Sequence, residues 1–187
     1  MQVTKTLSIK TRNEWRYWLK KNYKTEKEIW LVFQNKSSNK TGITYEEAVE
    51  EALCFGWIDS TIKKTEKDSH VQRFTPRNPK SGYSQLNKER LKKLLKHKKV
   101  ISSVRKAIGD LENEEFIFPK DILSEIKKNE AAWKNYQKFS EAYKRIRIAF
   151  IDGSRVRPDV FKQRLNYFIR MTEKNKQYGT PGIEKYL

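Results

Sequence analysis

Residues 44–87 read TYEEAVEEALCFGWIDS (44–60), TIKKTEKDSH (61–70) and VQRFTPRNPKSGYSQLN (71–87), and this stretch decides the fold. Thr44 and Glu47 have the spacing of a capping box, and Gly56 can take the left-handed conformation that ends a helix. Two short runs of strand-forming residues follow, 57–62 and 71–75, on either side of a charged turn. The stretch therefore predicts a helix followed by two antiparallel strands.

The sequence before this stretch extends the pattern into an α+β fold. The run EIWLVF at 28–33 is apolar and rich in strand formers, which predicts a third, buried strand. A polar loop at 35–42 follows it. Thr11 and Glu14 form a second capping box, which predicts a helix that starts at Arg12. We therefore expect a small antiparallel sheet with covering helices.

The sequence after this stretch is helical in pattern. Apolar residues recur at helical spacing in the segments 86–111, 119–126, 131–139, 143–151 and 158–169. These segments complete the predicted organisation, which has three parts. They are an N-terminal α+β domain at 1–115, a C-terminal helical module at 116–175 and a flexible tail at 176–187.

The composition limits the class of protein. An aromatic content of 12% argues against disorder, and 187 residues are enough to bury a core without disulfides or metal. The single cysteine, Cys54, excludes an intramolecular disulfide and suits a reducing compartment. No apolar run reaches the roughly 18 residues that a membrane-spanning helix needs. We expect a cytoplasmic protein with no membrane span, no cofactor and no metal site.

The positive charge is concentrated in one segment. The net charge is +18, and residues 63–106 hold 15 Lys or Arg against three acids, a local excess of +12. An excess of this kind is typical of proteins that bind nucleic acid or another polyanion. The alternative is compositional, because lysine is far commoner than arginine in this chain, as in proteins from AT-rich genomes. Surface lysines would then serve only solvation.

A proline-bracketed loop within this segment is the first candidate site. Together with the end of the preceding helix it supplies a predicted anion- or ligand-binding set: Trp57, Asp59, Arg73, Arg77, Lys80, Ser81, Tyr83, Ser84 and Asn87. Backbone N–H groups and the positive end of a helix dipole favour a phosphate or carboxylate at such a loop. In the alternative interpretation, Ser84 or Asn87 caps the next helix, and Asp59 forms an ion pair with Arg73 or Arg77.

The helix predicted after this loop is the second candidate site. Its basic residues form a predicted polyanion-binding set: Lys88, Arg90, Lys92, Lys93, Lys96 and Lys99. Basic amphipathic helices lie against phosphate backbones, acidic proteins or anionic membranes. The alternative is a core helix with a solvated face. Four arginines further on, Arg145, Arg147, Arg155 and Arg157, are candidates to extend a basic surface.

Two further groups have structural explanations. Cys54 lies between apolar residues on the predicted helix, where a small buried cysteine is common, although a nearby histidine would make it a candidate nucleophile. Four acids begin the same helix: Glu46, Glu47, Glu50 and Glu51. The helix dipole favours acids at this end, which accounts for them without catalysis.

Four segments resemble the bacterial YdeI/OmpD-associated family, often labelled bacteriocin-protection. They are EIWLVFQNK (28–36), TYEEAVEEALCFGWIDS (44–60), RFTPRNPKSGYSQLN (73–87) and SRVRPDVFKQRL (154–165). The chain departs from the family pattern at Tyr83, where Trp is usual, at Lys98, where many relatives have Gly between two helices, and at Val160-Phe161, where Thr-Arg is usual. The resemblance implies a bacterial protein linked by name to antimicrobial-peptide resistance and envelope stress.

These observations lead to two hypotheses of function. In the first, the chain is a non-enzymatic binding protein in stress or antimicrobial-peptide tolerance that captures a polyanion such as nucleic acid through its basic loop and helix. In the second, it is an enzyme or a binder of small anionic ligands with a pocket around Trp57, Asp59 and Arg77. An acidic protein that docks on the C-terminal module is a further possible partner.

Overall fold

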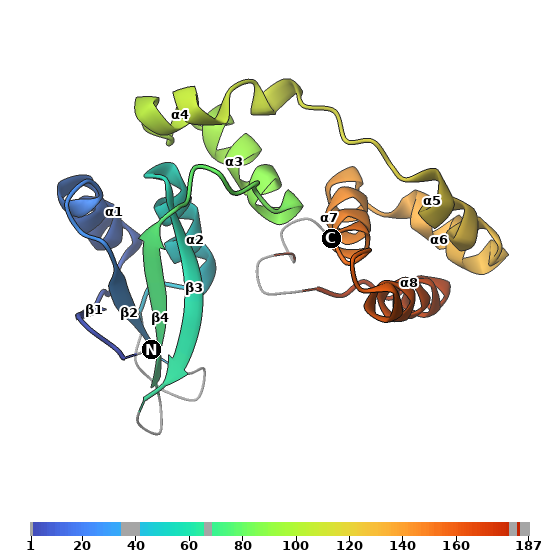
Figure 1. The fold of residues 1–187 in the computed structure, drawn as a ribbon, viewed down its shortest axis with the longest axis horizontal. Coiled ribbons are helices and arrows are strands. Elements are labelled where there is room, and N and C mark those ends of the chain that lie inside the picture. The colour runs from blue at the N-terminus through green and yellow to red at the C-terminus, as the bar shows by residue number, and fades with distance from the viewer. Residues whose placement is uncertain (1, 35–41, 66–68, 180–182, 184–187) are drawn as a thin grey trace. The chain divides into compact units, whose positions relative to one another are not determined.

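The computed structural model describes residues 2–34, 42–65, 69–179 and 183 (Figure 1). Most of the predicted loop at 35–42, and residues 66–68 of the charged turn, lie outside the described residues. The chain forms two compact units. The N-terminal unit comprises Met1–Gly82 and Arg90–Glu112, and the C-terminal unit comprises Tyr83–Glu89 and Asn113–Leu187.

A four-stranded sheet forms the centre of the N-terminal unit, in the order β1-β2-β4-β3. Its strands are β1 (Thr6–Ser8), β2 (Ile29–Gln34), β3 (Trp57–Lys64) and β4 (Ser69–Pro76). The three predicted strands pair antiparallel, whereas β1 pairs parallel with β2. The α+β prediction is confirmed, and the unpredicted edge strand β1 makes the sheet mixed.

Two capped helices precede and follow β2. Helix α1 (Arg12–Asn22) begins at Thr11, whose hydroxyl accepts a hydrogen bond from the Glu14 backbone N–H at 3.2 Å. Helix α2 (Tyr45–Cys54) begins with a complete capping box between Thr44 and Glu47. Both starts agree with the sequence, because a cap depends only on residues three positions apart. After α2, Gly56 turns the chain into β3 with a φ of +74°.

Helices α1 and α2 cover the same face of the sheet. Alternation and strand pairing place Phe33, Asp59 and Phe74 on one face. On that face Trp15 of α1 packs edge-on against Phe74, and Tyr45 of α2 contacts both Phe33 and Asp59. The core between the helices and this face is rich in aromatic and aliphatic side chains. It includes Trp15, Leu19, Ile29, Leu31, Leu53, Trp57 and Phe74, all fully buried.

Two short helices follow the sheet. Helix α3 (Gln85–Lys96) and helix α4 (Ser102–Ile108) are separated by a turn, and a 3₁₀ turn, η1 (Leu111–Asn113), comes next. Helix α3 ends in a Schellman motif, in which the N–H of Lys98 donates to Leu95 O at 2.9 Å and the N–H of Lys99 donates to Leu94 O at 3.0 Å. Lys98 therefore lies in the left-handed region, with a φ of +54°.

The C-terminal unit is helical, as predicted. It contains α5 (Lys120–Lys127), α6 (Glu130–Lys138), α7 (Glu141–Asp152) and α8 (Pro158–Glu173). Their apolar faces share a core that includes Ile122, Tyr136, Ile148 and Phe168. The sequence predicts a flexible tail from residue 176. Within that segment the Tyr178 N–H donates to the Tyr143 hydroxyl at 2.9 Å, and Ile183 is buried in the same core.

Candidate functional site

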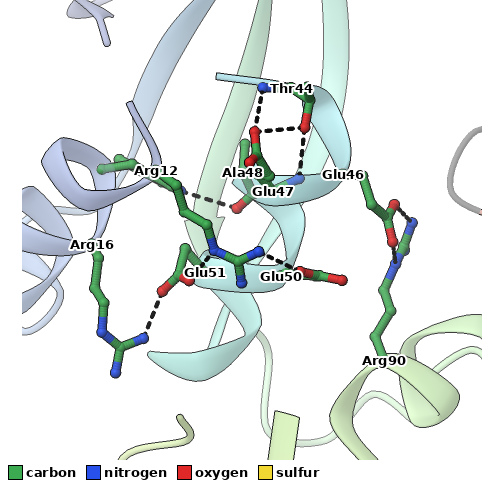
Figure 2. A network of polar contacts seen from close by, with 10 residues as sticks. Arg12, Arg16, Thr44, Glu46, Glu47, Ala48, Glu50, Glu51 and Arg90 are labelled. Carbon is green, nitrogen blue, oxygen red and sulfur yellow. Dashed lines mark hydrogen bonds and ion pairs between the residues drawn. The ribbon is translucent and has the colours of Figure 1, made fainter. Parts of the chain in front are cut away.

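The carboxylates of α2 are bound by arginines from α1 (Figure 2). Arg12 donates from Nη1 to Glu50 at 2.8 Å and from Nε to Glu51 at 2.6 Å. Arg16 donates from Nη1 to the second oxygen of Glu51, also at 2.6 Å. Glu51 is only 1% exposed, so its charge is stabilised by two guanidinium groups inside the protein. Together these four side chains form the α1–α2 network.

Burial and hydrogen bonding act in opposite directions on these arginines. Burial disfavours a charged guanidinium, but hydrogen bonds and attraction to the carboxylates outweigh it. The net effect raises the pKa of Arg12 through Glu51 and Glu50, and that of Arg16 through Glu51. Both guanidinium groups of the α1–α2 network are therefore charged at neutral pH. We did not anticipate Arg12 and Arg16 from the sequence, although two arginines four positions apart on a predicted helix mark one charged face.

Hydrogen-bond partners, as well as the helix dipole, therefore account for the acids of α2. Glu47 completes the capping box, and Glu46 accepts two hydrogen bonds from Arg90, with 3.0 Å between its Oε1 and Nε (Figure 2). Arg90 is 3% exposed. Its side chain belongs to the interior of the N-terminal unit, which removes it from any surface that binds a polyanion.

The residues predicted to line a small-ligand pocket have partners within the fold. Trp57 is 1% exposed, and its indole N–H donates to the Tyr23 carbonyl at 3.1 Å. Asp59 was predicted to bind a ligand, with an ion pair to Arg73 or Arg77 as the alternative. It instead accepts hydrogen bonds from the Tyr45 hydroxyl at 2.8 Å and from the Gln72 amide at 3.2 Å. Burial, together with the Asp59 charge, raises the pKa of Tyr45.

Arg73 lies on the opposite face of the sheet from Asp59. It is opposite Trp30 in the β2–β4 pairing, and its Nε donates to Glu28 at 2.6 Å. Hydrogen bonds from Thr4 and Arg73 lower the pKa of Glu28. Strand alternation separates Arg73 from Asp59, which is why the alternative of an Asp59–Arg73 ion pair is not realised.

The proline-bracketed loop divides between the two units, after Gly82. In the N-terminal unit, the Arg77 N–H donates to Gly56 O at 2.9 Å, and Asn78 accepts from the Lys80 N–H at 3.0 Å to form a tight turn. Lys80 and Ser81 are exposed on this turn. They are the members of the predicted anion-binding set that remain open to solvent in this unit.

In the C-terminal unit, Ser84 caps α3. Its hydroxyl accepts from the Asn87 N–H at 3.3 Å, and its carbonyl accepts from the Lys88 N–H at 2.9 Å. The alternative interpretation of the sequence made Ser84 a helix cap, and these contacts agree with that role. Tyr83 and Asn87 are half-buried beside it.

The basic residues predicted to bind a polyanion separate into two groups. Lys88 forms an ion pair with Glu114, and Arg90 is bound by Glu46. Lys93 and Lys96 are exposed on α3, and Lys92 and Lys99 are half-buried. Neither Lys93 nor Lys96 has an ion pair within the described part of the chain. The exposed lysines therefore carry the uncompensated charge of this helix.

The sequence around these lysines contains no acid to balance them. From Arg90 to Gly109 there are eight Lys or Arg and no Asp or Glu. Arg105 of α4 approaches Glu112 only to 3.9 Å, and both side chains are exposed. An exposed pair of this kind contributes little neutralisation at physiological salt. We call the exposed lysines of this stretch, Lys93, Lys96, Lys98 and Lys106, the lysine surface.

Other candidate chemistry finds little support. Cys54 is fully buried, and burial raises the pKa of its thiol to about 11, which disfavours the nucleophilic thiolate. The described ranges contain no cluster of three or more His, Cys, Asp or Glu side chains placed to hold a metal ion. Among the helices of the described segments, none combines the length and apolar character needed to cross a bilayer.

Two family models match the chain. One, described as "Domain of unknown function (DUF8412)", matches residues 7–107, and the other, described as "Bacteriocin-protection, YdeI or OmpD-Associated", matches residues 115–175. The second match confirms the predicted resemblance, and it contains the quoted segment at 154–165. The quoted segments at 28–36, 44–60 and 73–87 lie in the first match. No curated protein and no solved structure matches the chain.

Proposed function

The chain belongs to the family described as a domain of unknown function (DUF8412), and its C-terminal part matches the bacteriocin-protection, YdeI or OmpD-associated domain. We propose that it is a non-enzymatic binding protein that captures a polyanion. Nucleic acid is the proposed ligand, and the lysine surface is the proposed contact. The proposal places the protein in the cytoplasm, in stress or antimicrobial-peptide tolerance, in keeping with the bacteriocin-protection description of its C-terminal domain.

The observation that carries this proposal is that arginines of the N-terminal unit bind its carboxylates, whereas the residues of the lysine surface bind none in the described part of the chain. Arg12, Arg16, Arg73 and Arg90 each bind a carboxylate, and these pairs neutralise Glu28, Glu46, Glu50 and Glu51. The residues of the lysine surface, in contrast, are exposed in a stretch that contains no acid. Lysines on an exposed surface release condensed counterions when they approach phosphates, which supplies affinity without base readout.

The test is a titration of the protein into labelled 20-base-pair DNA at several salt concentrations, followed by fluorescence anisotropy. The double variant Lys93→Gln, Lys96→Gln keeps residues that favour helix and removes two charges from the lysine surface. We expect weaker binding and a shallower dependence of log K on log salt, by about 0.9 for each phosphate that the variant no longer neutralises.

The matched control is Lys134→Gln, Lys138→Gln on α6, which removes the same charge from exposed positions of the C-terminal unit. It should leave the salt dependence close to that of the parent protein. Equal effects of the two double variants would show that only net charge matters and would refute a defined lysine surface. Absence of binding at low salt would refute polyanion capture altogether.

A further inference from the structure

A second basic feature lies in the C-terminal unit, centred on Arg147 of α7. Arg147 is 4% exposed, and its Nε makes no hydrogen bond within the described residues. Its guanidinium lies against two rings, 4.8 Å from the ring centre of Phe150 and 4.1 Å from that of Tyr178. Aromatic rings stabilise a desolvated guanidinium, but they do not cancel its charge.

Helix α8 adds two more arginines, one on the ring of Phe150 and one on a third ring, that of Tyr167. Arg164 lies 3.7 Å from the ring centre of Phe150 and donates from Nη1 to the Phe150 carbonyl at 2.8 Å. Arg170 lies 5.2 Å from the ring centre of Tyr167, which packs edge-on against Tyr178 at 4.7 Å. Three guanidinium groups and three rings are thus linked by direct contacts. We call Arg147, Phe150, Arg164, Tyr167, Arg170 and Tyr178 the arginine–aromatic cluster.

The arginines of the cluster differ from Arg145 and Arg155 of the same unit, each of which binds an acid. Arg145, two residues before Arg147, binds Glu89 through two hydrogen bonds at 2.7 and 2.9 Å. Arg155 binds both Asp121 and Asp152. Among the described residues, none of the three arginines in the cluster has a carboxylate partner. Within the described part of the chain, the positive charges gathered on Phe150, Tyr167 and Tyr178 therefore have no carboxylate to balance them.

The chemistry of the cluster narrows the class of ligand. Phe150 is 40% exposed and Tyr167 is 39% exposed, so arginines and accessible rings occur together on one surface. A ligand that uses both would carry negative charge and flat aromatic groups at short intervals. Single-stranded nucleic acid has this composition, with phosphates for guanidinium groups and bases that stack on rings or on guanidinium planes. A duplex hides the faces of its bases, and an acidic peptide would leave the rings without a function.

We propose that the arginine–aromatic cluster of α7 and α8 is a binding site for single-stranded nucleic acid. The inference shares its ligand class with the proposed function but stands on a different surface, so either can fail alone. Arg164 and Arg170 contact phosphates, and Tyr167 provides the stacking surface for a base. Arg147 orders Phe150 and Tyr178 from beneath, because it is buried against both rings.

The test compares a labelled 20-nucleotide oligo-dT with an abasic strand of the same length and with 20-base-pair duplex. Tyr167→Ala and Arg164→Gln should each weaken binding of oligo-dT roughly five- to a hundredfold. Tyr167→Phe retains the ring and should bind like the parent protein. The double variant Lys134→Gln, Lys138→Gln again serves as the charge control, and far-UV circular dichroism checks that each variant is folded.

The outcomes separate the two surfaces. Loss of oligo-dT binding in Tyr167→Ala with retention in Tyr167→Phe supports the cluster, and weaker binding of the abasic strand by the parent protein supports base stacking. The inference is overturned if Tyr167→Ala and Arg164→Gln both bind oligo-dT as tightly as the parent protein does. That result would stand even if the double variant Lys93→Gln, Lys96→Gln still weakened duplex binding. Equal affinity for the abasic strand, or full competition by poly-glutamate at equal charge, also overturns it in favour of a purely anionic or protein ligand.

Discussion

Replacing Lys98 by glycine should stabilise the N-terminal unit, because the end of α3 forces this lysine into a backbone conformation that suits glycine. The φ of Lys98 is +54°. A residue with a side chain costs about 1–2 kcal/mol in the left-handed region. Glycine avoids that cost but loses more backbone entropy on folding, roughly 0.5–1 kcal/mol. The expected net gain is therefore about 0.5–1 kcal/mol, or about 1–4 °C in Tm for a chain of this length.

The measurement is urea unfolding followed by tryptophan fluorescence. Four of the five tryptophans, Trp15, Trp18, Trp30 and Trp57, lie in the N-terminal unit, so the signal reports mainly on the unit that contains Lys98. The midpoint should rise in Lys98→Gly while the slope m stays constant, since the surface exposed on unfolding does not change.

Two variants in the same chain calibrate this prediction. Asn175 ends α8 with a φ of +52°, but asparagine tolerates this region, so Asn175→Gly should gain less than Lys98→Gly. Lys96→Gly changes a residue in the last turn of α3 and should lose up to about 1 kcal/mol. A midpoint for Lys98→Gly as low as that of Lys96→Gly would refute the left-handed conformation of Lys98.

Two further predictions concern the interior of the N-terminal unit. Glu51→Gln should lower the free energy of unfolding by about 3–5 kcal/mol, because it leaves two guanidinium groups around a neutral side chain. The control Glu47→Gln, at the cap of α2, should lower it by about 1 kcal/mol or less. Equal losses in urea unfolding would contradict the role assigned to the α1–α2 network. Cys54 should react with iodoacetamide at pH 8 at least about a hundredfold more slowly in the native protein than in urea, since it is buried and its thiol is protonated. Rapid labelling of the folded chain, read by mass spectrometry, would show that Cys54 is accessible.

Features fixed by neighbouring residues could be predicted from the sequence. The capping boxes at Thr11 and Thr44 and the turn at Gly56 depend on contacts within one helical turn, and all three are present. Strand β1 could not be predicted, because three residues carry no periodic pattern. It exists only because Thr6–Ser8 pairs with β2, some two dozen residues later.

The partners of charged side chains were the least predictable part of the candidate site. Arg12 and Glu51 are 39 residues apart, and only the packing of α1 on α2 brings them together. The alternative interpretation gave Asp59 an arginine partner, but β3 and β4 pair so that Gln72 faces it and Arg73 does not. The sequence indicated which residues carry charge, whereas the tertiary fold decides which charges remain exposed.

The two edges of the sheet limit how this protein can associate. Exposed strand edges can accept a strand from another molecule and so promote aggregation. Here one edge is β1, which has only three residues. The other is β3, whose register shifts between Asp59 and Ile62 and which ends at Lys63 and Lys64. Edge-to-edge pairing is disfavoured by the shortness of β1, by the irregularity of β3 and by the lysines at the end of β3. The sheet is therefore protected from pairing with the sheet of a neighbouring molecule, although it is rich in strand-forming residues.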